Sequence, residues 1–136
     1  MMRSKPIEAA LAFVEAINAG SLERLTALMT EDHVFFDSDG ANCPGKLSMT
    51  DAWRNYFAMV PDYRITVTET FSSGGTVMLA GQAEGTFVQD RILRPENHWR
   101  VPAAWRAVIV GDKVALWQVY VNPEVMTKIF KRLKGE

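Results

Sequence analysis

The chain has 136 residues, of which 48% are apolar and 23% are charged, and its formal net charge at pH 7 is −1. These values are typical of a folded protein and exclude a disordered chain. This length predicts one domain with one core, spanning residues 1–136. Because basic and acidic residues nearly balance, we expect neither nucleic acid nor a membrane surface as a partner.

The sequence also lacks the usual signs of export and of metal binding. Glu8 and Glu15 interrupt the N-terminal apolar residues, so neither a signal peptide nor a membrane span is predicted. The single Cys43 has no partner for an internal disulfide, and no Cys or His residues have zinc spacing. We expect Cys43 to be a buried small residue, and the protein to be soluble, cytoplasmic and without metal or organic cofactor.

Two helices are expected at the N-terminus. Ser4 can cap the first, apolar residues recur at helical spacing from Ile7 to Ile17, and Gly20 ends it. Ser21 can cap a second, shorter helix, which must turn sharply against the first because only two residues separate them.

The middle of the chain alternates between strand and helix patterns. Residues 33–37 (HVFFD) predict a strand, which is followed by the turn-rich loop SDGANCPG. A capping signal at Ser48 predicts a third helix that ends at Pro61. Alternating residues then predict strands over 63–71 and 76–88, and the glycines inside the second strand indicate a bulge or a sharp bend.

The longest apolar stretch, residues 98–122, predicts a β-hairpin. Its turn falls at Gly111-Asp112, a pair that suits a tight antiparallel turn. Alternation sends Trp117, Val119 and Val121 to one face and the intervening large residues to the other. Such a sheet needs helices on one face and something else, such as a partner subunit, on the other.

Apolar residues at helical spacing after Pro123 predict a last helix. The element order, together with FVEAINAGSLERLTALMTEDHVFFD and GDKVALWQVYVN, resembles the nuclear transport factor two-like superfamily, which includes ketosteroid isomerases, polyketide-cyclase-like proteins and limonene-epoxide hydrolases. The resemblance implies an α+β cone, in which a curved, mainly antiparallel sheet carries three helices of the N-terminal half on its concave face, followed by a C-terminal helix. It also implies a hydrophobic conical pocket and a homodimer through the convex face, but it fixes no activity.

The resemblance assigns residues to the pocket. The family's pattern brings these side chains towards it: Phe13, Asp37, Trp53, Tyr56, Phe57, Trp117 and Val119. We add Trp105 as a ligand contact, although the place of the hairpin turn decides whether Trp105 or Arg106 faces inwards, and we expect Arg106 to point outwards. Large aromatic residues are usually core, so we expect two of the four tryptophans to touch the cavity.

Asp37 is the candidate catalytic residue. It ends the first strand where ketosteroid isomerases, which the chain resembles here, keep the aspartate that shuttles a proton. A carboxylate at the mouth of an apolar cone would be desolvated, which suits general acid–base chemistry. The alternative is a solvated turn aspartate that binds loop N–H groups.

The chain departs from the family at residues that support the known activities. Phe13 and Phe57 stand where those isomerases carry tyrosines, and their strand aspartic acid falls near Trp105-Arg106, so a steroid isomerase is not expected. Val119 replaces the final-strand aspartate of the epoxide hydrolases. The best enzyme hypothesis is a polyketide-cyclase-like reaction with Asp37 as the base and a tyrosine or tryptophan that orients a carbonyl.

The remaining polar candidates have structural interpretations. His33 and His98 begin strands without a partner at ligand spacing, and we expect both to be exposed strand-end residues. Asn122 is expected to cap the last helix. Three functions stay open: a cofactor-independent isomerase, cyclase or dehydratase that uses Asp37, a non-catalytic binding domain for a hydrophobic small molecule, and a dimeric protein-interaction module.

Overall fold

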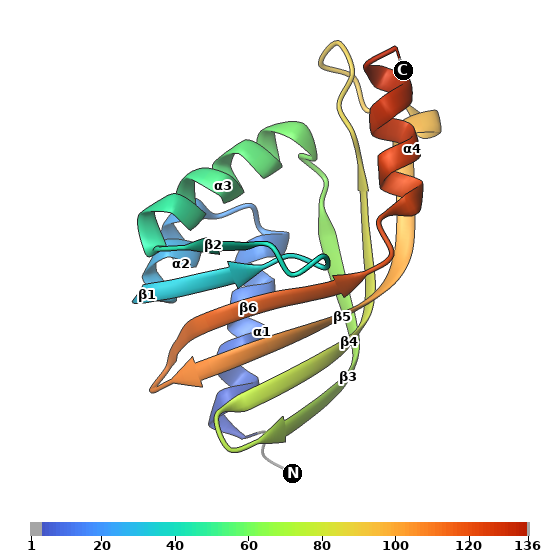
Figure 1. Cartoon of the computed structure of the whole chain (residues 1–136). Helices are drawn as coiled ribbons and strands as arrows, with labels where there is room; N and C mark the ends of the chain where they lie inside the picture. The colour runs from blue at the N-terminus through green and yellow to red at the C-terminus, as the bar shows by residue number, and fades with distance from the viewer. Residues whose placement is uncertain (1–3, 136) are drawn as a thin grey trace.

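The computed structural model describes residues 4–135. The helices are α1 (Lys5–Asn18), α2 (Leu22–Ala27), α3 (Lys46–Met59) and α4 (Glu124–Leu133), with a short 3₁₀ turn at Pro95–Asn97 (Figure 1). The strands are β1 (Met29–Phe36), β2 (Asn42–Pro44), β3 (Arg64–Ser73), β4 (Thr76–Thr86), β5 (His98–Val110) and β6 (Lys113–Val121). Within residues 4–135, no helix has both the length and the apolar character needed to cross a membrane.

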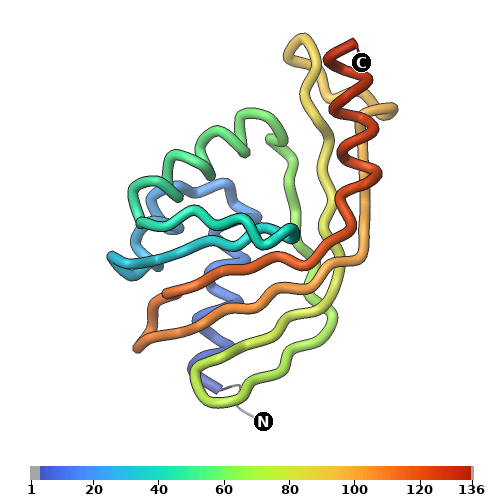
Figure 2. The backbone as a smooth tube through the Cα atoms, in the orientation of Figure 1, coloured from blue at the N-terminus to red at the C-terminus, as the bar shows by residue number. Residues whose placement is uncertain are grey.

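One six-stranded sheet organises the fold, with the strand order β2-β1-β6-β5-β4-β3. Neighbouring strands are antiparallel except β1 and β6, which are parallel. The backbone tube in Figure 2 shows that β4 and β5 bend strongly along their length. The helices α1, α2 and α3 lie on the concave side, and α4 follows the last part of β4 and the first part of β5 (Figure 1). The expected α+β cone is confirmed.

Two glycines allow β4 to bend, as the sequence predicts. A Cβ atom at Gly81 would lie 1.9 Å from the backbone oxygen of Thr66, and the pairing register of β3 and β4 shifts beside this contact. A Cβ atom at Gly85 would lie 2.4 Å from Cγ1 of Val60. No larger residue fits either position, because the neighbouring chain approaches too closely.

The first residues of the helices show whether the capping residues were predicted correctly from the sequence. The hydroxyls of Ser4 and Ser21 accept backbone N–H groups of α1 and α2 at 3.3 and 3.2 Å, so both expected caps are confirmed. The expected start of α3 at Ser48 is wrong, because the helix begins at Lys46. Gly45, with a φ of 105°, leads directly from β2 into the helix, and only glycine adopts this conformation easily.

The first strand is longer than predicted, and its hairpin partner β2 was not predicted. β1 begins at Met29, which is fully buried and pairs with Val114 of β6. After the turn, β2 returns along β1 with Pro44 opposite Val34. The strand Asn-Cys-Pro contains no β-branched or aromatic residue, so nothing in the sequence signals it.

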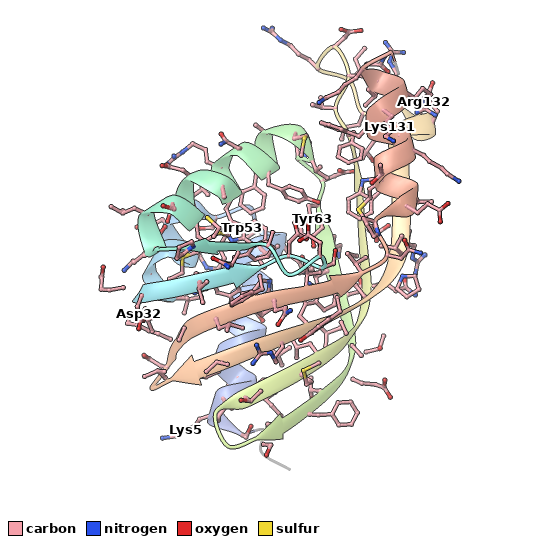
Figure 3. The ribbon with its side chains drawn as sticks, in the orientation of Figure 1. Lys5, Asp32, Trp53, Tyr63, Lys131 and Arg132 are labelled. Atoms are coloured by element: carbon pink, nitrogen blue, oxygen red, sulfur yellow. The ribbon has the colours of Figure 1, made fainter. Side chains whose placement is uncertain are left out.

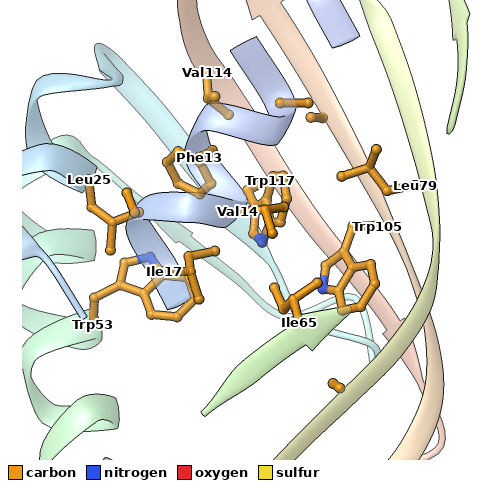
Figure 4. Close-up of a cluster of buried hydrophobic side chains, with 14 of the residues drawn as sticks. Phe13, Val14, Ile17, Leu25, Trp53, Ile65, Leu79, Trp105, Val114 and Trp117 are labelled. Atoms are coloured by element: carbon orange, nitrogen blue, oxygen red, sulfur yellow. The ribbon is translucent and has the colours of Figure 1, made fainter. Parts of the chain in front are cut away.

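The core lies between α1 and the inner face of the sheet (Figure 4). The fully buried ring of Phe13 has its centroid 4.8 Å from Trp117 and 5.8 Å from His33. Asn18 attaches the end of α1 to β3, because its side chain donates to the backbone oxygen of Ile65 at 2.9 Å and accepts from the backbone nitrogen at 2.8 Å. These contacts fix α1 on the sheet.

His33 belongs to this core, so the expectation of an exposed strand-end residue is wrong. Its ring is fully buried, and Nδ1 lies 2.7 Å from the backbone oxygen of Val114. Because a carbonyl only accepts, Nδ1 carries the proton. Burial lowers the pKa of His33 below 6.5, outweighing the opposite effects of the bond to Val114 and the charge of Asp32. His33 is therefore a neutral residue that links β1 to β6.

Candidate functional site

The concave side of the sheet holds a cavity of about 660 Å³ that is open on one side. Residues of the sheet, including β1, and of the helices α3 and α4 line it, and most of them are apolar or aromatic. Asp37 is the only charged residue among the described residues of the lining. The lining comprises Phe35, Asp37, Ser38, Cys43, Met49, Ala52, Trp53, Tyr56, Met59, Tyr63, Ala83, Phe87, Trp99, Trp105, Trp117, Val119, Val121, Pro123, Met126, Thr127 and Phe130.

A chain of aromatic rings, which we call the aromatic wall, connects α3 to α4 along this cavity. Its members are Trp53, Tyr56, Tyr63, Trp99, Phe87 and Phe130. Successive ring centroids in this order are 6.1, 5.0, 6.0, 6.2 and 5.8 Å apart. Figure 3 shows two of these rings, Trp53 and Tyr63, between α3 and the sheet. These spacings are typical of favourable aromatic packing, so the wall is a continuous surface.

Most of the residues expected at the pocket border the cavity. The lining includes Asp37, Trp53, Tyr56, Trp105, Trp117 and Val119. All four tryptophans take part, so the expectation of two was too low.

Phe13 and Phe57 do not belong to the lining, which corrects their expected positions. Phe13 packs against Trp117 on its α1 side, within the core. Phe57 follows Tyr56 on α3 and therefore points about 100° away around the helix, with its ring centroid 5.4 Å from that of Trp53. Neither ring reaches the cavity in this arrangement.

Asp37 has the turn position considered from the sequence and also borders the cavity. Its side chain is exposed at the edge of the cavity, so the enclosed, desolvated setting expected for a general base is not found. Its carboxylate accepts the backbone N–H of Ser38 at 2.8 Å, and its own N–H donates to Ala41 at 2.8 Å. Asp37 therefore closes the β1–β2 turn while its carboxylate borders the cavity.

Two tyrosines supply hydrogen-bond donors that Phe13 and Phe57 lack. Burial raises the pKa of Tyr56 far above its ordinary value, and the charges of Tyr63 and Asp37 raise it further. Burial also raises the pKa of Tyr63. Both phenols therefore stay protonated at neutral pH and can donate to a ligand.

Two indole groups in the lining have unused donors. Nε1 of Trp53 and Nε1 of Trp99 are buried and have no hydrogen-bond partner among the described residues. A buried donor without an acceptor is unfavourable, so an acceptor atom that reached either nitrogen would gain a strong hydrogen bond.

The lining contains further residues that the sequence did not predict, among them Tyr63, Phe87, Trp99, Met126 and Phe130. For the last two a signal exists, because they lie four residues apart on α4 and share one face of that helix. The first three reach the cavity because the sheet bends, and alternation along a strand does not report a bend.

Polar residues on the opposite, convex face take no part in this cavity. Arg106 points to that face, as expected, and donates to the side chain of Gln118 at 3.2 and 3.3 Å. His98 is exposed, as expected, with Nδ1 2.9 Å from the hydroxyl of Thr86 and Nε2 3.5 Å from a carboxylate oxygen of Glu84.

Two further residues have clear structural positions. Cys43 is half-buried and borders the cavity, whereas a buried core position was expected. Asn122 accepts the backbone N–H of Glu124 at 3.0 Å, in agreement with its expected capping role. Within residues 4–135, no three His, Cys, Asp or Glu side chains are grouped so that they could hold a metal ion.

The sequence identifies the family directly. A family model described as the SnoaL-like domain matches residues 10–117, which is most of the chain. The chain therefore belongs to the SnoaL-like domain family. Among curated proteins, no significant sequence match was found.

Solved structures agree with this fold. A proposed SnoaL-like polyketide cyclase from Shewanella denitrificans is similar with a TM-score of 0.81 at 14% identity, over 96% of this chain and 99% of that one. An epoxide hydrolase of the limonene-epoxide-hydrolase-like type from Mycobacterium tuberculosis gives 0.77 at 16%, over 96% and 92%. A ketosteroid-isomerase-like protein from Catenulispora acidiphila in complex with trimethylamine gives 0.71 at 20%, over 83% and 84%. At these identities the likeness concerns the fold.

Proposed function

We propose that this protein is a small-molecule-binding domain whose cone holds a hydrophobic ligand. The observation that carries this proposal is the cavity of about 660 Å³, whose lining is almost entirely apolar and aromatic. This volume and lining are typical of ligand sites, and a packed core would not leave such a space. The SnoaL-like family and its structural neighbours, one of which was solved in complex with trimethylamine, support a small-molecule ligand.

Binding of a neutral fluorescent probe, N-phenyl-1-naphthylamine, tests the proposal. We expect its fluorescence to rise with saturation in the wild-type protein. Ala83 lies on the floor of the cavity and is buried, so Ala83→Leu fills part of the space and should weaken binding at least tenfold. Ala58→Leu is the control, because Ala58 is exposed on α3 and is absent from the lining. Equal binding by both variants would contradict the proposal.

A second candidate function is acid–base catalysis on a carbonyl compound, such as an isomerisation, cyclisation or dehydration. It is supported by Asp37 and Tyr56, which both line the cavity. In this scheme Asp37 removes a proton next to the carbonyl, and the Tyr56 hydroxyl donates to the oxygen on which charge develops. Neither a metal nor an organic cofactor is needed.

Deuterium exchange tests this second candidate without a known substrate. A panel of cyclic ketones is incubated in D₂O, and NMR measures exchange of the protons next to the carbonyl. We expect exchange above the buffer rate in the wild type, and a loss of at least 100-fold in Asp37→Asn, in which probe binding remains. Equal exchange by the wild type and Asp37→Asn would exclude Asp37 as the base.

We also propose a cytoplasmic homodimer that pairs through the convex face. Large apolar side chains are exposed on this face, including Phe71 (58%) and Tyr120 (42%). Light scattering should report twice the chain mass, and Tyr120→Glu should lower it towards one chain. A monomeric wild type would overturn the dimer. A dimer that does not bind the probe would favour a protein-interaction module instead.

A further inference from the structure

The chemistry of the aromatic wall points to a particular class of ligand. Resting on the binding function proposed above, we propose that the cavity takes an organic ammonium ion, whose apolar part fills the cone and whose cationic head lies between the aromatic rings and Asp37.

The first argument is the geometry of three rings at one corner of the cavity. Tyr56 is perpendicular to both Trp53 and Tyr63, at 88° in each case. Trp53 and Tyr63 are inclined at 39°, with centroids 6.4 Å apart. Tyr56 thus packs edge to face with both rings, and all three residues, which we call the aromatic corner, line the cavity. The electron-rich faces of indole and phenol rings attract cations, and ammonium groups bound by several such rings are a known mode of recognition.

The second argument is the charge of the lining. Asp37 carries the only formal charge among the described lining residues, and no lysine, arginine or histidine is present there. An anionic ligand would find no cationic side chain to pair with, whereas an ammonium group finds a carboxylate at the edge of the cavity. Asp37 lines the same cavity as the three rings of the aromatic corner.

The third argument is that the carboxylate is already in position before a ligand binds. Asp37 is held in the β1–β2 turn by its bonds to Ser38 and Ala41, so the carboxylate is in place without a ligand. Tyr56 and Tyr63 remain protonated and therefore uncharged. Asp37 is thus the one negative charge that the described lining offers to a cation. Its exposed position makes Asp37 a modest contributor, and most of the selectivity must come from the rings.

Two ligands of the same shape separate charge from hydrophobicity. Benzyltrimethylammonium and neopentylbenzene differ only by a quaternary nitrogen in place of a quaternary carbon. Displacement of N-phenyl-1-naphthylamine measures both affinities. We expect the cation to bind at least tenfold more tightly than the hydrocarbon. Equal or tighter binding of the hydrocarbon would overturn the ammonium proposal, while probe binding would leave the general binding function intact.

Variants assign this preference to residues. Asp37→Asn should weaken cation binding about three- to tenfold and leave hydrocarbon binding unchanged. Asp39→Asn is the control, because Asp39 lies in the same turn but outside the lining. Tyr63→Phe, which keeps an aromatic face, should retain the preference, and Tyr63→Leu should reduce it at least threefold. A preference that survives both Asp37→Asn and Tyr63→Leu would overturn the assignment.

A direct titration tests the proposal if the fluorescent probe does not bind. If the wild type does not bind N-phenyl-1-naphthylamine, calorimetric titration with benzyltrimethylammonium is carried out directly. Heat that saturates, and that is smaller in Asp37→Asn, would support the ammonium proposal alone. No binding up to millimolar concentration would overturn both the ammonium proposal and the general binding function.

Discussion

The two halves of the cone use the same kinds of residue in opposite ways. Near α1, the ring of Phe13 is fully buried against helix and sheet, and its centroid lies 4.8 Å from that of Trp117, which also borders the cavity. Towards α4, the aromatic wall has slightly longer ring spacings, such as 5.0 and 6.0 Å, and it lines the cavity of about 660 Å³. The difference lies in what covers the rings. The number of aromatic residues therefore does not distinguish the core from the proposed binding site. The position of α1, which covers only the core, does.

The covering helices differ in how firmly they are held. The buried face of α1 carries six buried residues, and Asn18 bonds it to β3. No residue of α4 is buried, and its side-chain hydrogen bonds to the rest of the described chain come from Arg132, which donates to Glu96 and Asn97. The closed half should therefore determine stability, and the open half should determine binding.

The largest expected effect is in the closed half. Phe13→Ala should lower the free energy of unfolding by about 3–5 kcal/mol, because a fully buried ring is removed and α1 cannot collapse into the space. Urea denaturation measures the change. A loss below about 1 kcal/mol would show that α1 and the sheet do not form the core described.

The second effect concerns pH and also lies in the closed half. In the folded protein the pKa of His33 lies below the 6.5 of the unfolded chain, so below about pH 6.5 the unfolded state binds more protons. This contribution to stability is complete above pH 6.5 and is lost as the pH falls towards the folded pKa, with a slope of at most about 1.4 kcal/mol per pH unit. Urea denaturation between about pH 5 and 7 should show it.

Two histidine variants identify the source of that pH dependence. His33→Gln should remove this part of the slope, and His98→Gln, which changes an exposed residue, should retain it. The same slope in the wild type and His33→Gln would contradict the buried, neutral state of His33.

A smaller effect on stability is expected in the open half. Phe130 is 37% exposed, and its ring centroid is 5.8 Å from that of Phe87. Phe130→Ala should lower the free energy of unfolding by less than about 1 kcal/mol, while probe affinity falls at least threefold. A variant as unstable as Phe13→Ala would mean that α4 is part of the core and that the comparison of the two halves is wrong.

The smallest effect is an expected absence of change. Since the pKa values of Tyr56 and Tyr63 are strongly raised, neither phenol ionises near pH 11 while the protein is folded. The rise in phenolate absorbance up to about pH 11 should therefore be the same in the wild type, Tyr56→Phe and Tyr63→Phe. A smaller rise in either variant would show that its phenol is open to water.

The sequence predicts the closed half well and the open half in part. Periodicity and caps locate α1 and α2, and the Gly111-Asp112 turn locates the final hairpin, because these signals are local. The position of Trp99 depends on the bend of β4 at Gly81 and Gly85. This bend decides which residues on one face of the sheet come close together. Such a bend is a property of the assembled sheet.

The candidate base Asp37 shows a second limit of the sequence. Asp37 was correctly placed at the end of β1 beside the cavity, yet its exposure depends on the β1–β2 turn, and the strand β2 has no sequence signal. Likewise, the absence of tyrosines at Phe13 and Phe57 predicts a cone poorly supplied with donors, whereas Tyr56 and Tyr63 both line the cavity. Donor chemistry can thus be retained when its positions change.

The most direct test of this account is a ¹H–¹⁵N NMR titration with N-phenyl-1-naphthylamine, with the residues assigned. We expect the indole signal of Trp99 and the amides of Tyr63 and Met126 to shift with one common saturation curve, while amides of the closed half, such as Ala10, stay in place. Shifts confined to the convex face, or no shifts at all, would show that the cavity is not a binding site.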